Sequence, residues 1–215
     1  MDLLPLIESR RFLGREFLTW LWFESDLFGG ELSASAVGLL EVAFERQITL
    51  VGGPKGNEES KLKGVNPSAS SEAREALRQG KLPTVARARI RKDERDFAFV
   101  FVADTLALSS LKLPDLINES GDEPFFDRVA LIEEIESALG ALYADFLRLR
   151  ADDVWADVVL PAILRWVRDE PEPALERYSA ARDRALAGAR PKADAGPKAA
   201  AGPKAAASKA AKRAA

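Results

Sequence analysis

Residues 82–103 read LPTVARARIRKDERDFAFVFVA, and this stretch decides the fold. Two alternating runs, residues 82–91 and 96–103, flank the charged segment Lys92-Asp93-Glu94-Arg95, which is the pattern of a β-hairpin. In the first run, small and apolar side chains share one face, and cations occupy the other. In the second run phenylalanine alternates with Ala and Val, so both faces are apolar. That composition predicts a central strand covered on both sides.

The segments before the hairpin give one helix signal and two strand signals. Apolar residues recur at helical spacing from Ser9 to Ser25, which predicts an amphipathic helix. Residues 41–51 predict a half-buried strand with a phase slip at Glu45-Arg46. The segment 52–57 is rich in glycine and predicts a turn, and residues 61–65 predict a short second strand.

A second helix precedes the hairpin, and an apolar stretch follows it. Asn66 is expected to cap this helix with Pro67 in its first turn, and Gly80 is expected to end it in the left-handed conformation. Leucines from 106 to 113 continue the apolar pattern after the hairpin until Pro114 closes it.

The rest of the chain is predicted to be helical up to a low-complexity tail. Residues 124–150 carry one long apolar stripe, and residues 153–168 form a second helix that Pro161 should kink. Residues 172–189 predict a third, weaker helix. We therefore predict an α+β domain, with an antiparallel sheet flanked by helices and followed by C-terminal helices.

The domain is expected to span residues 1–189, and residues 190–215 are expected to be a disordered tail. The tail repeats with a period of six, has a proline in each unit and almost no large apolar residue, so it cannot form a packed core. Its cations are candidate DNA ligands: Lys192, Lys198, Lys204, Lys209, Lys212 and Arg213.

Composition excludes several classes of enzyme. The 215-residue chain contains no Cys and no His, so it has no Cys-His or Ser-His-Asp nucleophile, no imidazole base and no Cys/His zinc site. The glycine-rich segment 52–56 lacks the spacing of a phosphate-binding loop. We expect no enzymatic activity, no cofactor and no small-molecule substrate. Two carboxylate clusters are interpreted without a metal ion. Asp152, Asp153 and Asp157 are expected to be an acidic helix start that the helix dipole stabilises, and Glu133, Glu134 and Glu136 to be a solvated helix face.

The net charge of −3 conceals an uneven distribution. Residues 191–215 carry six cations and one acid, or +5, so residues 1–190 carry −8. An acidic body with a basic tail indicates a polyanion partner or a solubilising extension. No run of about 18 apolar residues and no basic amino-terminal region occurs, so we expect a cytoplasmic protein without a membrane partner.

Two strands carry the other candidate DNA-binding residues. Arg87, Arg89 and Arg91 share a strand face with a spacing of about 7 Å, close to that of successive phosphates on one DNA strand. Lys61 and Lys63 share a face in the same way. The alternative is an ordinary solvent face on which these cations pair with neighbouring carboxylates.

One segment resembles a known family. The sequence FLGREFLTWLW at 12–22 resembles a segment of the recombination-associated RdgC family. The helix ending in Gly80-Lys81, the hairpin, the stretch 111–113 and a long helix opened by Phe125-Phe126-Asp127 follow in the order of that family's carboxyl-terminal half. The resemblance covers residues of about 10 to 150.

The resemblance implies a non-enzymatic protein that binds double-stranded DNA without sequence preference and restrains recombinase filaments. Family members form a ring-shaped dimer, so a homodimer at the nucleoid is expected, although the family's amino-terminal half has no counterpart here. Ring closure would then need that half from a separate chain or from an upstream start. The alternative is a dimerisation or partner-docking module without DNA binding, with an exposed interface at Trp20, Trp22 and Phe23.

Overall fold

The structure is a computed structural model that describes residues 4–54, 56, 58–115, 123–170 and 175–187. The described strands are β1 (Glu31–Ala34), β2 (Gly38–Gly52), β3 (Glu58–Gly64), β4 (Lys81–Lys92), β5 (Arg95–Val102) and β6 (Ala107–Lys112). The described α-helices are α1 (Leu4–Leu27), α2 (Ser71–Arg78), α3 (Glu123–Ala151), α4 (Leu160–Val167) and α5 (Leu175–Ala187). The predicted α+β class is confirmed, and the tail from residue 190 lies outside the described residues.

The strands form one antiparallel sheet in the order β1-β2-β4-β5-β6. β3 also pairs with β2, beside residues 46–52, whereas β1 pairs with residues 38–41. β4 pairs with the other edge of β2. β1 and β3 therefore lie along the same edge of this long strand, one at each end. The sequence did not predict β1 or β6 as strands.

The hairpin is confirmed as β4 and β5, with Lys92 paired to Arg95. Asp93 and Glu94 both have positive φ, 47° and 67°. A two-residue turn with these angles twists in the same right-handed sense as the strands that it joins. The predicted slip in the strand before it is also confirmed. The β2–β4 register shifts between Phe44 and Ile48, around Arg46 at φ 61°.

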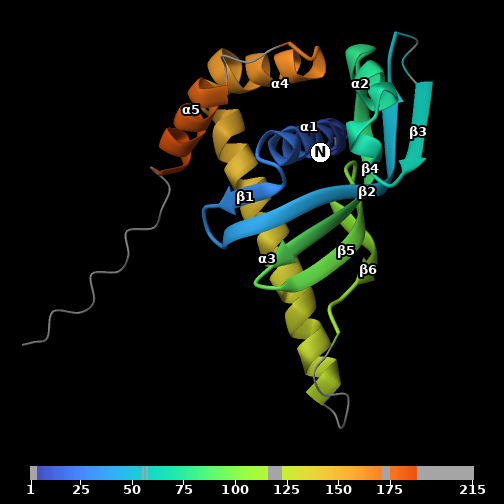
Figure 1. Cartoon of the computed structure of the whole chain (residues 1–215), viewed down its shortest axis with the longest axis vertical. Helices are drawn as coiled ribbons and strands as arrows, with labels where there is room; N and C mark the ends of the chain where they lie inside the picture. The colour runs from blue at the N-terminus through green and yellow to red at the C-terminus, as the bar shows by residue number, and fades with distance from the viewer. Residues whose placement is uncertain (1–3, 55, 57, 116–122, 171–174, 188–215) are drawn as a thin grey trace, which may run out of the picture.

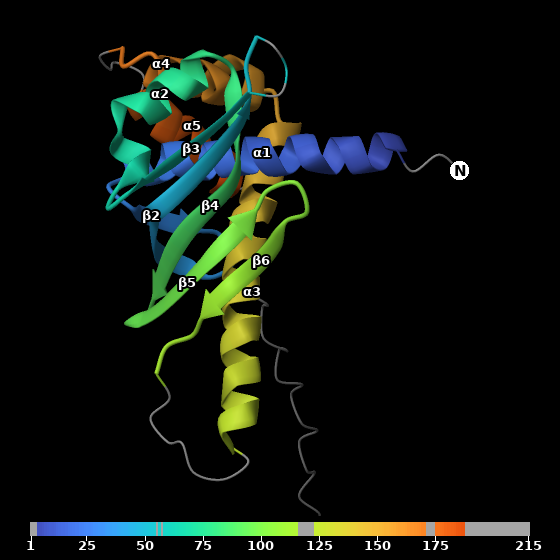
Figure 2. The same cartoon turned by 90° about the vertical axis from the view of Figure 1, so that its right-hand side faces the viewer.

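One face of the sheet packs on helices and the other does not. α1 and α3 lie behind the sheet in Figure 2, on the side that we call the inner face. The inner face contains Phe97, Phe99 and Phe101 of β5, which are at most 4% exposed. The opposite side of β5 carries Ala98, Val100 and Val102, which are half-buried, and no helix of the described residues covers it. The prediction that this strand is covered on both sides was therefore wrong, and we call this second side the outer face.

α1 is the central helix of the core. It lies between the sheet and the helices α3, α4 and α5 (Figure 1). Its aromatic side chains Trp20, Trp22 and Phe23 are at most 1% exposed, so the predicted exposed interface at these residues is wrong. Apolar residues surround the whole helix between 17 and 23, which is the pattern of a helix buried on all sides.

α3 packs on the core from Leu131 onward. Ile135, Leu142 and Phe146 are fully buried there. Its amino-terminal end extends past the sheet in both views (Figures 1 and 2). The predicted apolar stripe continues onto this end at Phe125 and Val129. Phe125 and Phe126 are 67% and 69% exposed.

The shorter helices depart from the predicted caps. Asn66 makes no side-chain cap, and Pro67 begins a 3-10 turn, Pro67–Ala69, ahead of α2. Ser70 is the cap of α2, because its Oγ accepts from the Ala73 amide at 3.2 Å. Gly80, at φ 80°, follows the end of α2 as predicted.

The two carboxyl-terminal helices were both predicted. Immediately before Pro161, residues Trp155–Val159 form a π-helical turn. Proline has no amide hydrogen to donate to the preceding turn, so this wide turn is the irregularity expected at that position. α5 is firmly packed although its sequence signal is weak, because Tyr178 and Leu186 enter the core.

Candidate nucleic-acid interface

The five candidate cations of the two strands lie on the same face of the sheet. Thr49 of β2 is paired with Lys61 on one side and with Val85 on the other. Directly opposite residues share a face, and so do residues two apart on one strand. The outer face therefore carries a set that we call the basic face: Lys61, Lys63, Arg87, Arg89 and Arg91.

The basic face consists of two rows. The lysines follow β3 and the arginines follow β4, with β2 between them. Adjacent strands are about 4.8 Å apart, so the rows are separated by about 10 Å. The bulge in β2 lies opposite Arg87. The sequence predicted each row, but only the strand register shows that they share a face.

Carboxylates occupy part of this face. Arg89 Nε lies 2.8 Å from Glu45 Oε1, and Arg89 Nη1 lies 3.4 Å from Asp96 Oδ1. Arg91 is 3.7 Å from Glu41 and 3.9 Å from Asp96. These two arginines fit the alternative that the sequence left open, a solvent face with paired charges.

The remaining three cations form no ion pair with any described residue. Lys61 and Lys63 are exposed, and Arg87 is half-buried beside Val85 and Val100 on the outer face. Unpaired cations keep their full attraction for an external anion, because no neighbouring carboxylate must first be displaced. Lys61, Lys63 and Arg87 are therefore the part of the basic face best able to bind phosphate.

The six tail cations lie outside the described residues, so the structure places none of them. The tail adds to the basic face only as a sequence-based expectation.

The two carboxylate clusters form no metal site among the described residues. Asp152 instead accepts the Val154 amide at 2.9 Å. Glu134 accepts from Lys92 at 3.1 Å and from Arg95 at 2.7 Å, which ties α3 to the hairpin turn. Burial alone would raise the pKa of Glu134, but these two hydrogen bonds to cations lower it below the ordinary value.

A buried polar cluster that the sequence did not reveal fixes α5 to α1. Arg182 Nε donates to Glu24 Oε1 at 2.8 Å, Tyr178 Oη donates to the same carboxylate, and Trp20 Nε1 donates to Tyr178 at 3.1 Å. Burial raises the pKa of Glu24, against the attraction of the Arg182 charge. Burial and the Glu24 charge raise the pKa of Tyr178 well above its ordinary value. An acid at position 24, within an otherwise apolar helical segment, was the available sequence signal.

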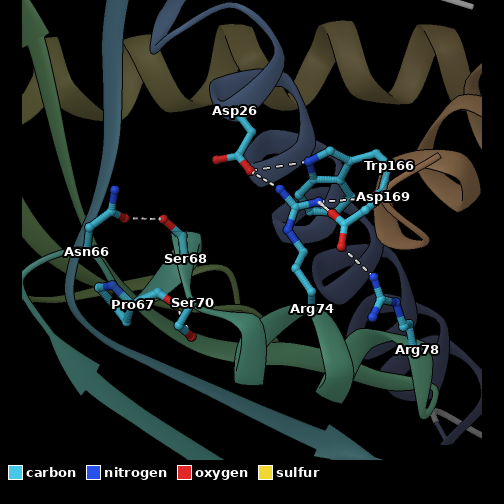
Figure 3. A network of polar contacts seen from close by, with 9 residues as sticks. All are labelled: Asp26, Asn66, Pro67, Ser68, Ser70, Arg74, Arg78, Trp166 and Asp169. Carbon is cyan, nitrogen blue, oxygen red and sulfur yellow. Dashed lines mark hydrogen bonds and ion pairs between the residues drawn. The ribbon is translucent and has the colours of Figure 1, made fainter. Parts of the chain in front are cut away.

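A second network joins α2 to α4 (Figure 3). Arg74 donates to Asp26 at 2.5 Å and to the Trp166 carbonyl at 2.7 Å, and its guanidinium lies 4.0 Å from the Trp166 ring centroid. Arg78 donates to Asp169 at 2.5 Å. Burial raises the pKa of Asp26 and lowers the pKa of Arg74. These contacts hold α2 against α1 and against the end of α4.

No protein-family model, curated protein or solved structure matches the chain. α1 and α3 are the longest helices of the described residues, and neither has a segment apolar enough to cross a lipid bilayer.

Proposed function

We propose that the protein binds double-stranded DNA without sequence preference and acts in DNA recombination as a modulator of recombinase filaments, with no catalytic step of its own. The carrying observation is the group Lys61, Lys63 and Arg87, three unpaired cations on an open sheet face. The resemblance to the RdgC family supplies the link to recombination. Binding to chromosomal DNA would place the protein in the cytoplasm, at the nucleoid.

The arrangement of the basic face suits a phosphate backbone better than base edges. A row of side chains about 7 Å apart on a strand follows consecutive phosphates on one DNA strand. The outer face presents no protruding helix or loop among the described residues that could enter a groove. Contacts to phosphate position a protein without reading sequence. Binding should therefore be general for duplex DNA and sensitive to salt.

The acidic body restricts where DNA can bind. Residues 1–190 carry −8, so phosphate is repelled by the molecule as a whole and attracted only locally. Arg89 and Arg91 can join a DNA contact by exchanging their carboxylate partners for phosphate. Exposed ion pairs of this kind are worth at most about 1 kcal/mol each, so the exchange is inexpensive.

A salt series separates the basic face from the tail. Each phosphate contact contributes about 0.9 to the slope of log K against log salt, so six tail cations and three sheet cations predict a slope near −8 for the full chain. A 1–190 truncation should retain a slope near −3. Gel shifts on a duplex of random sequence measure both values. Equal slopes would remove the tail from the proposal, and a truncated chain that fails to bind would remove the sheet.

A further inference from the structure

The amino-terminal half of α3 carries an apolar stripe that the rest of the described structure leaves exposed at Phe125 and Phe126 and covers only in part at Val129 and Ile132. Phe125 and Phe126 are 67% and 69% exposed, and Val129 and Ile132 are 37% and 36% exposed. This half of the helix extends beyond the sheet (Figure 2). Burying two such aromatic side chains is strongly favourable, so a stripe of this kind indicates an interaction surface.

The same helix face leads into a groove. It has a volume of about 370 Å³ and lies between α3 and the strands β5 and β6. α3 contributes four residues to it, Glu136, Leu139, Gly140 and Tyr143, and Leu106 and Leu108 lie opposite. A Cβ atom added at Gly140 would meet no atom within 4 Å, so the groove is open at this point.

The stripe cannot fill the groove of its own chain. Phe125 and Gly140 are 15 positions apart on one continuous helix, which at 1.5 Å per residue separates them by about 22 Å. A rigid helix cannot fold back over that distance. The groove is therefore accessible to the phenylalanines of a second copy and closed to those of its own.

The spacing along α3 fits a second copy that runs in the opposite direction. The stripe and the groove together follow alternating steps of four and three residues: Phe125, Val129, Ile132, Glu136, Leu139 and Tyr143. This order of steps reads the same from either end. Two antiparallel copies thus meet residue against residue around a two-fold axis between positions 132 and 136.

We propose that this stripe is a self-association surface, on which two copies of the chain pair their α3 helices antiparallel. Phe125 of each copy lies against Tyr143 of the other, and Val129 lies against Leu139. Phe126 is level with Leu142 of the other copy in this register, about 3 Å along the helix axis from Gly140, where the missing side chain leaves room. The inference is independent of DNA binding, because it uses no residue of the basic face.

Area and charge indicate a weak, reversible dimer. Phenylalanine buries about 150–250 Å² when fully covered, so four phenylalanines that are two-thirds exposed remove roughly 400–700 Å² from water. The groove walls contribute a similar area, which brings the total near the lower limit for specific complexes. Glu136 from both copies lies close to the two-fold axis, and like charges there weaken the pair.

Sedimentation velocity on the full chain, from about 5 to about 300 μM, tests the proposal. We expect a concentration-dependent dimer. The double variant Phe125→Ser with Phe126→Ser should weaken the association of the dimer at least about 100-fold, because each copy contributes both side chains to one end of the interface. A matched control, Leu39→Ser with Val65→Ser, should leave it unchanged, because these residues are 62% and 93% exposed and belong to neither the stripe nor the groove.

Two further variants act in directions that a general folding defect cannot reproduce. Gly140→Leu should weaken the dimer at least about 10-fold by filling the groove, while raising the thermal midpoint of the monomer, because leucine is a better helix former than glycine. Glu136→Gln should tighten the dimer about 3- to 10-fold by removing the charge repulsion. A wild-type chain that stays monomeric at about 300 μM would overturn the proposal and assign the stripe to a different partner. A dimer that is indifferent to the phenylalanine variants would overturn it too.

Discussion

Gly14 allows α1 to approach the end of β5, and its replacement by alanine tests the packing of the core. Gly14 is buried in α1, and an ideal Cβ at this position would lie 1.9 Å from the Ala103 carbonyl oxygen and 3.2 Å from Leu106 Cδ2. Real Cβ atoms do not come within 3.0 Å of backbone, so α1 or the end of β5 must move by about 1 Å or more.

The cost of that movement can be bounded. Forcing one extra methyl group into a close-packed site costs about 1–3 kcal/mol. A shift of α1 also loosens the paired hydrogen bonds from Arg15 to Asp104, at 2.6 and 2.8 Å. Both side chains are about a quarter exposed, so solvent screens this pair and it is worth up to about 1 kcal/mol. Alanine is a better helix former than glycine, which offsets about 1 kcal/mol of this loss in the free energy of unfolding. We expect Gly14→Ala to lower the free energy of unfolding by up to about 3 kcal/mol.

Gly140→Ala is the matched control for this experiment. It makes the same change in an α-helix, but its Cβ meets nothing within 4 Å. Only the gain in helix propensity remains, so this variant should raise the free energy of unfolding by about 0.5–1 kcal/mol. Urea denaturation followed by circular dichroism measures both. Two variants that shift stability in the same direction would refute the packing of α1 on Ala103.

Two further predictions concern charged groups. Arg182→Met should destabilise the protein by about 3–5 kcal/mol, because it leaves the Glu24 carboxylate buried without its cation. Adding Glu24→Gln to this variant should recover part of the lost stability. Denaturation of the single and double variants at pH 7 measures both effects, and a double variant without any recovery would contradict the pairing. Because the pKa of Glu134 is lowered, its bonds to Lys92 and Arg95 stabilise the fold fully at a pH above its ordinary pKa of 4.5. This contribution, about 1 kcal/mol, is lost as the pH falls through the lowered pKa. Glu134→Gln should therefore flatten the stability profile between about pH 5 and 3, and an unchanged profile would argue against the contact.

The sequence predicted the elements whose pattern is long and regular. The hairpin, the long helix and the bulge near Arg46 follow directly from side-chain alternation and its interruption. β1 was missed because four residues give too short a pattern. β6 was missed because Ser109 and Ser110 interrupt its leucines.

Features that depend on tertiary contacts could not be predicted from one amino-acid sequence. The aromatic residues of α1 indicated an interface, but only the docking of α3, α4 and α5 shows that the rest of this chain covers them. The same limit applies to the basic face. Sequence placed Lys63 and Arg87 on separate strands, and the pairing of both strands with β2 brings them to one side.

The direct test of the central claim is the affinity of the full chain for duplex DNA when the unpaired cations of the basic face are removed. Fluorescence anisotropy on a labelled duplex would compare Lys61→Gln/Lys63→Gln/Arg87→Gln with a control of equal charge, Arg128→Gln/Arg165→Gln/Arg184→Gln, at exposed positions on α3, α4 and α5. Removing three phosphate contacts should reduce the steepness of the salt slope by about 2.7, and the control should leave the slope unchanged. Identical slopes for the two triple variants would contradict DNA binding by this face.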